Sequence, residues 1–413
     1  MKQKRYIKKL LPVLVAAWML PASCDDKLDD LWSSQSHNIE FEAQTLTVQT
    51  RLSDTDLGMR NEFREGDSFG VLGYCVPCQI GSDDPDYSAG SSVWTTKISN
   101  AVPDVFNKQK VTLTSGIWQY DYTNVDGEQT TYKPKYWYAD GKDTEGNDAG
   151  SINAENYRYD FFAYYPYDSG VFSWEKPTSD TDKGAPRVKV RVPQSEGEDM
   201  NPIDTPDAML SVIHNYQRQI NSRVAFNFNH VFTALGFEVN NFSETDLWVH
   251  SIKLTGTFWR SLTVDFKDGS YTYNTDDTYT GTYVLFDEDE DGGTLYLSAP
   301  GKDETSTSSP SPIGGEYLRL LPGGFEGENY LGPIVAGGSG EEKIIELKIT
   351  YTFEGKTKEA SYTRPATFLP QSGMQYTSQL NFVGGAFVLQ FVVDNSESWE
   401  DGESDNDGDI IFE

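Results

Sequence analysis

Three cysteines and four histidines are the side chains of this 413-residue chain best suited to do chemistry. Cys75 and Cys78 have the Cys-x-x-Cys spacing of thiol–disulfide oxidoreductases, which need the motif at a helix N-terminus that lowers the thiol pKa. Here the pair ends a strand-like run, 69–76, and enters the turn-forming run 81–85. We therefore expect a short-loop disulfide or two idle thiols rather than redox chemistry.

The histidines, His37, His214, His230 and His250, do not have the spacing of metal ligands in HExxH or HxH motifs. His230 ends an alternating run, which predicts a structural histidine hydrogen-bonded at a strand end or between sheets. The sequence contains no nucleophile elbow and no phosphate-binding glycine loop. In a chain with 64 acidic residues, carboxylates that are close in sequence do not indicate acid–base catalysis. We expect no enzymatic activity, no catalytic residues, no cofactor and no metal.

Two acidic runs have the composition of calcium-binding loops. The first, 287–292, begins like an EF-hand loop, but Ser298 occupies position 12, where such a loop closes with a glutamate, and no helical pattern flanks it. The second, 405–409, matches in composition alone. Solvated acidic loops are expected at both places.

The N-terminus has the layout of a secretory signal. A basic head at positions 2–9 precedes an apolar run, 10–20, which is too short to span a bilayer. Cys24 follows two small residues and resembles the lipobox cysteine of bacterial lipoproteins, which is acylated and becomes the mature N-terminus, although Pro21 replaces the most frequent leucine. We predict a signal peptide at 1–23 and lipidation at Cys24; ordinary secretion with an incidental cysteine is the alternative.

The charge of the chain limits its partners. Its net charge is −31, and outside the signal peptide no segment concentrates lysine and arginine, so nucleic-acid binding is not expected. The acidic stretch 25–30 resembles the surface-export signal of Bacteroidetes lipoproteins, or is a solvated spacer. Acidity of this kind suits the surface of a soluble extracellular protein.

The pattern of the remaining chain predicts sheets. Aromatic residues make up 13% of it, and short apolar–polar alternations are separated by turn residues without any helical repeat. Residues 207–213 could form a helical turn or a strand. The absence of a βαβ pattern favours antiparallel sandwiches. The predicted strands are 45–49, 68–76, 136–138, 157–167, 188–192, 224–239, 248–254, 262–266, 294–297, 344–351, 376–382 and 386–393.

Taken in order, several segments resemble those of the Bacteroidales fimbrillin superfamily, the FimA/Mfa-like pilins. The resemblance rests on a first strand followed by an arginine, a Gly-Asp strand, aromatic strands, an F-x-H-x-x-x-x-L segment and a late tryptophan. These correspond to 39–41 with Thr50-Arg51, 66–71, 136–137, 161–166, 228–235, 373–376 and Trp399.

That resemblance implies an all-β chain with two tandem transthyretin-like (Greek-key) β-sandwich domains and no catalysis. It also implies export as a lipoprotein and cleavage after an arginine by a trypsin-like protease. In this sequence residues 24–51 would be the lipidated spacer and removable first strand, with the strand at 45–50 and Arg51 as the processing site; Arg60 and Arg64 are weaker candidates. The domains are expected at 52–222 and 223–413, with a boundary known to about 15 residues.

The expected function is a structural or adhesive subunit, stalk or tip, of a cell-surface fimbrium. A sandwich that loses a strand exposes unpaired backbone groups along an apolar slot, which another subunit's strand can fill. The acidic tail 400–409 leaves only 410–412 as apolar residues to donate, so a tip position stands beside a stalk position.

The expected partners are other fimbrial subunits, the outer membrane through the lipid of the precursor, and a host or bacterial surface ligand. The expected locations are the outer membrane and the extracellular fimbrium. The alternative function is a surface glycan-binding outer-membrane lipoprotein that uses Trp94, Trp118 and Trp137, although these residues could equally fill the cores.

Overall fold

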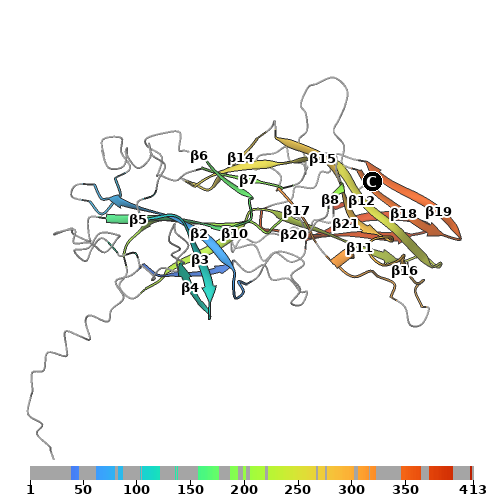
Figure 1. Ribbon diagram of the computed structural model, residues 1–413. Helices are drawn as coiled ribbons and strands as arrows, with labels where there is room; N and C mark the ends of the chain where they lie inside the picture. The colour runs from blue at the N-terminus through green and yellow to red at the C-terminus, as the bar shows by residue number, and fades with distance from the viewer. Residues whose placement is uncertain are drawn as a thin grey trace, which may run out of the picture.

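In the computed structural model, the regular secondary structure of the described residues is almost entirely β-strand (Figure 1). The structure describes residues 39–45, 62–79, 82–86, 103, 105–120, 135, 137, 157–175, 187–193, 199–200, 205–218, 222–266, 268–274, 277–301, 306–315, 317–321, 346–363, 372–393 and 410–411. Within these ranges the only helical element is one short 3-10 turn, η4 (Ile313–Gly315), and no helix is long and apolar enough to cross a membrane. The predicted all-β class is confirmed.

The first sheet has seven strands, antiparallel except for β1, which runs parallel to β10. In spatial order the strands are β1 (Phe41–Thr45), β10 (Val224–His230), β9 (Met209–Tyr216), β5 (Tyr157–Tyr165), β2 (Ser68–Pro77), β3 (Phe106–Thr114) and β4 (Ile117–Tyr120). β10 shows why the sequence forms this sheet, since its apolar residues are buried and the residues between them are exposed in strict alternation.

This sheet curves until its two edge strands, β1 and β4, approach each other. The Tyr120 hydroxyl donates to the carbonyl oxygen of Ile39 at 2.7 Å, and the Ile39 amide donates to the carbonyl oxygen of Lys135 at 2.8 Å. The concave face therefore encloses a core of its own, rich in aromatic side chains.

The opposite face of the seven-stranded sheet is covered by a four-stranded sheet. Its strands are β14 (Ser270–Tyr273), β13 (Ser261–Asp265), β7 (Arg187–Arg191) and β6 (Phe172–Glu175). Phe162 stacks on Phe266 across the layers, with ring centroids 5.0 Å apart, and Tyr164 lies 5.0 Å from Trp174. The central pair joins β7 to β13, so strands that are far apart in the sequence share one sheet.

Two further sheets form a second sandwich. One contains β17 (Leu318–Leu320), β11 (Thr233–Asn241), β20 (Gln375–Val383), β21 (Ala386–Val393) and β22 (Ile410–Ile411). The other contains β19 (Lys356–Thr363), β18 (Glu346–Phe353), β12 (Leu247–Trp259), β15 (Thr278–Asp287) and β8 (Asp199–Met200), with β16 (Leu295–Leu297) also paired to β12. Rings from β18 and β20 meet between them, as Tyr351 and Phe353 lie 5.4 and 5.0 Å from Phe382.

The core of this second sandwich is continuous with the core beneath the four-stranded sheet. Figure 1 shows an elongated molecule with β5 towards one end and β19 at the other. The division at residues 222 and 223 stays a prediction. β10 begins after that division and pairs with β9 and β1 of the first sheet, while β13 pairs back to β7.

Candidate strand-exchange site

β1 is an edge strand held by a single neighbour within the described residues. Its register with β10 runs from Phe41 opposite Val224 to Thr45 opposite Phe228. On the outer face the Gln44 amide donates to Asn227 Oδ1 at 2.7 Å. Only one side of β1 is therefore joined to a described strand.

The inner face of β1 fills a slot lined by aromatic rings. Ile39 and Phe41 are 0% and 1% exposed, and Thr45 is also buried. The Phe41 ring lies against five others at centroid distances between 5.1 and 6.5 Å, those of Phe69, Phe106, Tyr120, Phe161 and Phe226. Loss of β1 would expose this slot together with the backbone groups of β10 that now bond to β1.

The sequence of β1 explains why the strand depends on the slot. Between Phe41 and Thr45 it has Glu42, Ala43 and Gln44, residue types that are neutral or depleted in strands. Burying Ile39 and Phe41 is worth about 1.5–3 kcal/mol for each side chain. β1 is thus held by tertiary contacts that a strand with a better apolar pattern could replace.

Two of the predicted site residues, Cys24 and Arg51, lie outside the described residues, as does Arg60. Arg64 is described and exposed. It follows Phe63, whose ring lies 5.2 Å from that of Trp118 and 5.4 Å from that of Phe228.

Glu65, the residue after Arg64, holds the same segment against the β3–β4 turn, because its Oε1 accepts a hydrogen bond from the Ser115 amide at 2.6 Å. A cut after Arg64 would therefore fall inside a docked segment; which arginine is the processing site stays a prediction.

At the C-terminus β22 pairs antiparallel with β21, with Ile410 opposite Phe391 and Ile411 opposite Gln390. Ile410 and Ile411 thus form an edge of the described five-stranded sheet. The acidic residues 400–409 that precede them are outside the described residues.

The cysteine pair lies on a strand and not at the start of a helix. Cys75 is 1% exposed within β2 and contributes to the core of the curved sheet, and Cys78 directly follows that strand. Both carry thiols rather than a disulfide, and burial raises the pKa of Cys78. Of the two arrangements expected, the structure has two thiols, and Cys78 Sγ lies 3.7 Å from the carbonyl oxygen of Asp83.

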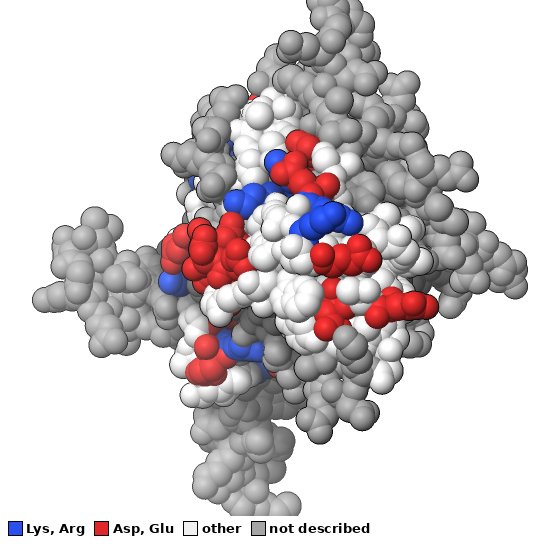
Figure 2. Space-filling view, turned by 90° about the vertical axis from the view of Figure 1, so that its right-hand side faces the viewer, with Lys and Arg blue, Asp and Glu red and all other residues white. Residues whose placement is uncertain are grey.

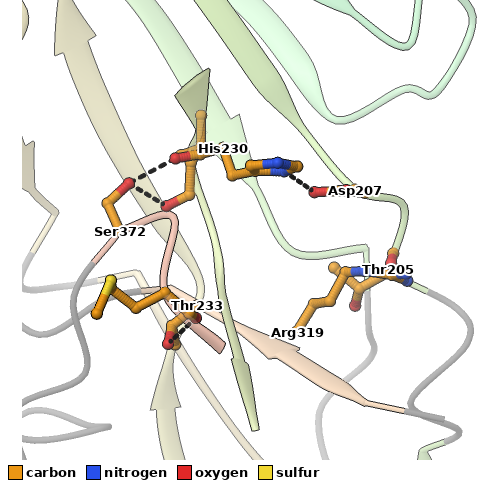
Figure 3. A network of polar contacts seen from close by, with 8 residues as sticks. Thr205, Asp207, His230, Thr233, Arg319 and Ser372 are labelled. Carbon is orange, nitrogen blue, oxygen red and sulfur yellow. Dashed lines mark hydrogen bonds and ion pairs between the residues drawn. The ribbon is translucent and has the colours of Figure 1, made fainter. Parts of the chain in front are cut away.

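His230, Asp207 and Ser372 come together where the seven-stranded sheet meets the second sandwich (Figure 3). His230 Nδ1 lies 2.9 Å from Asp207 Oδ1, and both side chains are buried. The Ser372 hydroxyl donates at 2.6 Å to the backbone carbonyl of His230 and at 3.1 Å to that of Val231. Because Ser372 contacts the backbone and not the imidazole, these three residue types do not form a nucleophilic triad.

Neighbouring contacts continue this network. The Thr233 hydroxyl donates to the Met374 carbonyl at 3.1 Å, and Arg319 Nη1 donates to the Thr205 carbonyl at 2.9 Å. The network fixes the turn between β10 and β11 against two distant segments. His230 has the structural role predicted for it, whereas Asp207 and Ser372, 23 and 142 residues away, carried no sequence signal.

The EF-like run forms the turn between β15 and β16. The Asp291 amide donates to the Asp287 carbonyl at 2.8 Å, and Asp287 pairs with Lys253 at 3.0 Å. Within the described ranges no three His, Cys, Asp or Glu side chains are grouped to hold a metal ion. Trp118 and Trp137 are 9% and 1% exposed, so neither offers a ring face to a glycan, and Trp94 lies outside the described residues.

The sequence of the chain matches the model of a known protein family. The model of the fimbrillin-like family matches residues 93–395, well over half of the 413 residues. The chain therefore belongs to the fimbrillin-like family. No curated protein matches it.

Several solved structures match this chain over most of its length. A candidate cell adhesion protein from Bacteroides ovatus shares 13% identity, covering 86% of this chain and 95% of that one, with a TM-score of 0.39. One from Bacteroides uniformis shares 14% identity over 86% and 96% of the two chains, with a TM-score of 0.40. A fimbrial assembly protein from Parabacteroides distasonis shares 8% identity over 86% and 96%, with a TM-score of 0.32.

Proposed function

We propose that this protein is a structural or adhesive subunit of a cell-surface fimbrium, exported as a lipoprotein and assembled by strand exchange. Membership of the fimbrillin-like family supports the fimbrial role and argues for a structural rather than an enzymatic protein. The observation that carries the assembly step is β1, an edge strand that is poor in strand-forming residues and whose Phe41 fills an aromatic slot.

In the proposed precursor, acyl chains on Cys24 hold the protein at the outer membrane, since several chains on one cysteine anchor firmly. β1 completes the curved sheet, so the precursor cannot accept a strand from another subunit. A trypsin-like protease then cuts after Arg51 and separates residues 24–51, including β1, from the rest of the chain. The cut alone does not release β1, because its ladder with β10 and its buried side chains still hold it.

The incoming strand comes from another fimbrial subunit. It must pair with β10 and bury at least as much apolar surface as Ile39 and Phe41 do now. Whether this chain also donates a strand depends on its own C-terminal end, where β22 has only two residues. A subunit that accepts a strand without donating one ends a fibre, so both a tip and a stalk position fit the proposal.

The test of strand exchange is Arg51→Ala, with Arg64→Ala as the matched control. The Arg51 variant is expected to remain a folded, lipid-anchored, uncut monomer that does not enter fibres, because β1 stays covalently attached in its slot. The Arg64 variant should be cut and should assemble like wild type. Electron microscopy of cells and immunoblots of sheared fibres measure both.

Two results would contradict the proposal. One is the Arg51 variant in fibres at wild-type levels with residues 24–51 still attached. The other is an Arg64 variant that stays uncut while the Arg51 variant is processed normally, which would move the cut to Arg64.

The anchor has its own test. Cys24→Ala should abolish the labelling of the protein by a clickable fatty acid, because no other residue follows a basic head, an apolar run and small residues. Labelled protein is detected in gels by in-gel fluorescence. Equal labelling of the variant and the wild type would show that the acyl chain is elsewhere.

A further inference from the structure

The outer face of the six-stranded sheet carries an aromatic pair, Trp248 on β12 and Tyr296 on β16. The two residues are opposite each other in the antiparallel ladder, and their ring centroids lie 5.4 Å apart at an angle of 45°. Tyr296 is 37% exposed and Trp248 is partly exposed, whereas Leu247 and Val249 on either side of Trp248 are buried. The pair therefore offers ring surface to the solvent.

Polar side chains are fixed beside these rings. Thr352 is opposite Trp248 on the neighbouring strand β18, and His250 follows two residues along β12. The His250 imidazole lies between two polar side chains, with Nδ1 2.7 Å from Glu288 Oε2 and Nε2 2.7 Å from the Thr352 hydroxyl. The hydrogen bond from His250, followed by that from the Thr294 hydroxyl, lowers the pKa of Glu288. Its carboxylate is thus ionised at neutral pH and able to accept hydrogen bonds.

We propose that this surface, formed by Trp248, Tyr296, His250, Glu288 and Thr352, binds a neutral glycan. The electron-rich faces of the aromatic rings suit the C–H groups on one face of a pyranose ring. Sugar hydroxyls both donate and accept hydrogen bonds. The carboxylate, imidazole and hydroxyl groups at the side of the rings can form hydrogen bonds with them. The proposal does not depend on cleavage or strand exchange.

The charge around the surface disfavours anionic ligands. The acidic turn that begins at Asp287 borders it, and Glu288 itself belongs to that turn. The positive charge of Lys253 on the same strand as Trp248 is paired with Asp287 at 3.0 Å. Figure 2 looks at this end of the molecule and shows acidic side chains in several groups with fewer basic ones among them. Sialylated and sulfated glycans should be repelled, at low ionic strength above all.

The pairing of β12 leaves no edge on that strand for an added peptide strand. Trp248 lies in ladders with Tyr296 on one side and with Thr352 on the other. A partner that contacts Trp248 therefore does so through side-chain groups on the face of the sheet, as a sugar does.

The test is binding of the full mature chain to an array of neutral oligosaccharides (N-acetyllactosamine, fucosylated, mannose-type and xylose-type chains) and their sialylated or sulfated counterparts. Hits are titrated by calorimetry. We expect binding of a neutral glycan and weaker binding of its sialylated form. Trp248→Ala and Tyr296→Ala should each weaken binding roughly tenfold, the size of one lost aromatic contact. Ile117→Ala is the control, since Ile117 is 44% exposed on β4 of the seven-stranded sheet and should not affect binding.

The proposal is wrong if no neutral glycan binds, or if the Trp248→Ala/Tyr296→Ala double variant binds as wild type does. A preference for the sialylated forms would also overturn it. Should Trp248→Ala prevent folding, Tyr296→Ala still decides, because Tyr296 is the more exposed ring. A subunit that assembles normally but binds no glycan refutes this inference and leaves the proposed function intact.

Discussion

Phe41→Ala in the uncut precursor should lower the free energy of unfolding of the curved sheet by about 3–5 kcal/mol, the range for removing a buried aromatic side chain. Phe41 is 1% exposed and touches five rings, and β1 has no second neighbouring strand within the described residues to share the loss. Urea unfolding followed by tryptophan fluorescence measures the change through the midpoint.

The matched control for this prediction is Glu42→Ala, one residue along the same strand. Glu42 is exposed, so its replacement should change stability by no more than about 0.5 kcal/mol. Equal effects of the two substitutions would mean that the slot does not hold β1. In a subunit cut after Arg51, Phe41→Ala should also speed the exchange of residues 24–51 for a competing strand.

Asp207→Ala should cost about 1–3 kcal/mol, the range for leaving a buried polar group without its hydrogen bond. His230 Nε2 is buried without a hydrogen-bond partner among the described residues, so the Asp207 carboxylate supplies the described contact of the imidazole. Without this hydrogen bond the buried imidazole has no described partner where the seven-stranded sheet meets the second sandwich. Thermal and urea unfolding measure the loss.

The control for Asp207 is Asp207→Asn, whose amide oxygen can still accept the hydrogen bond from Nδ1. This variant should lose clearly less stability than Asp207→Ala. If both variants unfold at the same urea concentration as wild type, the contact does not stabilise the junction.

The sequence predicted the fold class because the alternation of apolar and polar residues is a local signal. In β10 the predicted alternation matches the observed burial residue by residue. The same signal could have found the Trp248 surface, since Leu247 and Val249 are buried and the alternation turns Trp248 outwards.

The sequence predicted a wrong strand boundary where contacts between distant segments decide the fold. The alternation after Val224 was expected to continue to Val239 as one run, but a turn at Val231 and Phe232 ends β10 and sends β11 into a different sheet. The large apolar residues fall at even positions before the turn and at odd positions after it, but alternation holds no information on which sheet a strand joins.

The removable strand is predicted at 45–50, where Leu46 and Val48 alternate with polar residues; residues 46–50 lie outside the described residues, so that placement stays a prediction. The strand that the structure describes just before them is β1 (Phe41–Thr45). The apolar–polar pattern of β1 is weak. The strand forms because the Phe41 ring fits a slot built from strands that are more than 20 residues away in the sequence. The alternatives for residues 207–213 are settled in favour of a strand for the same reason, because β9 lies between β10 and β5.

The ladder between β7 and β13 has a mechanical consequence for a fibre. Five residue pairs, from Arg187 opposite Asp265 to Arg191 opposite Ser261, join an early strand of the chain to one about 70 residues later. Pulling the two ends of the subunit apart would load these hydrogen bonds together with the packed core and would not simply straighten a linker. A filament of such subunits should therefore resist tension as a stiff rod, with little stretch before rupture.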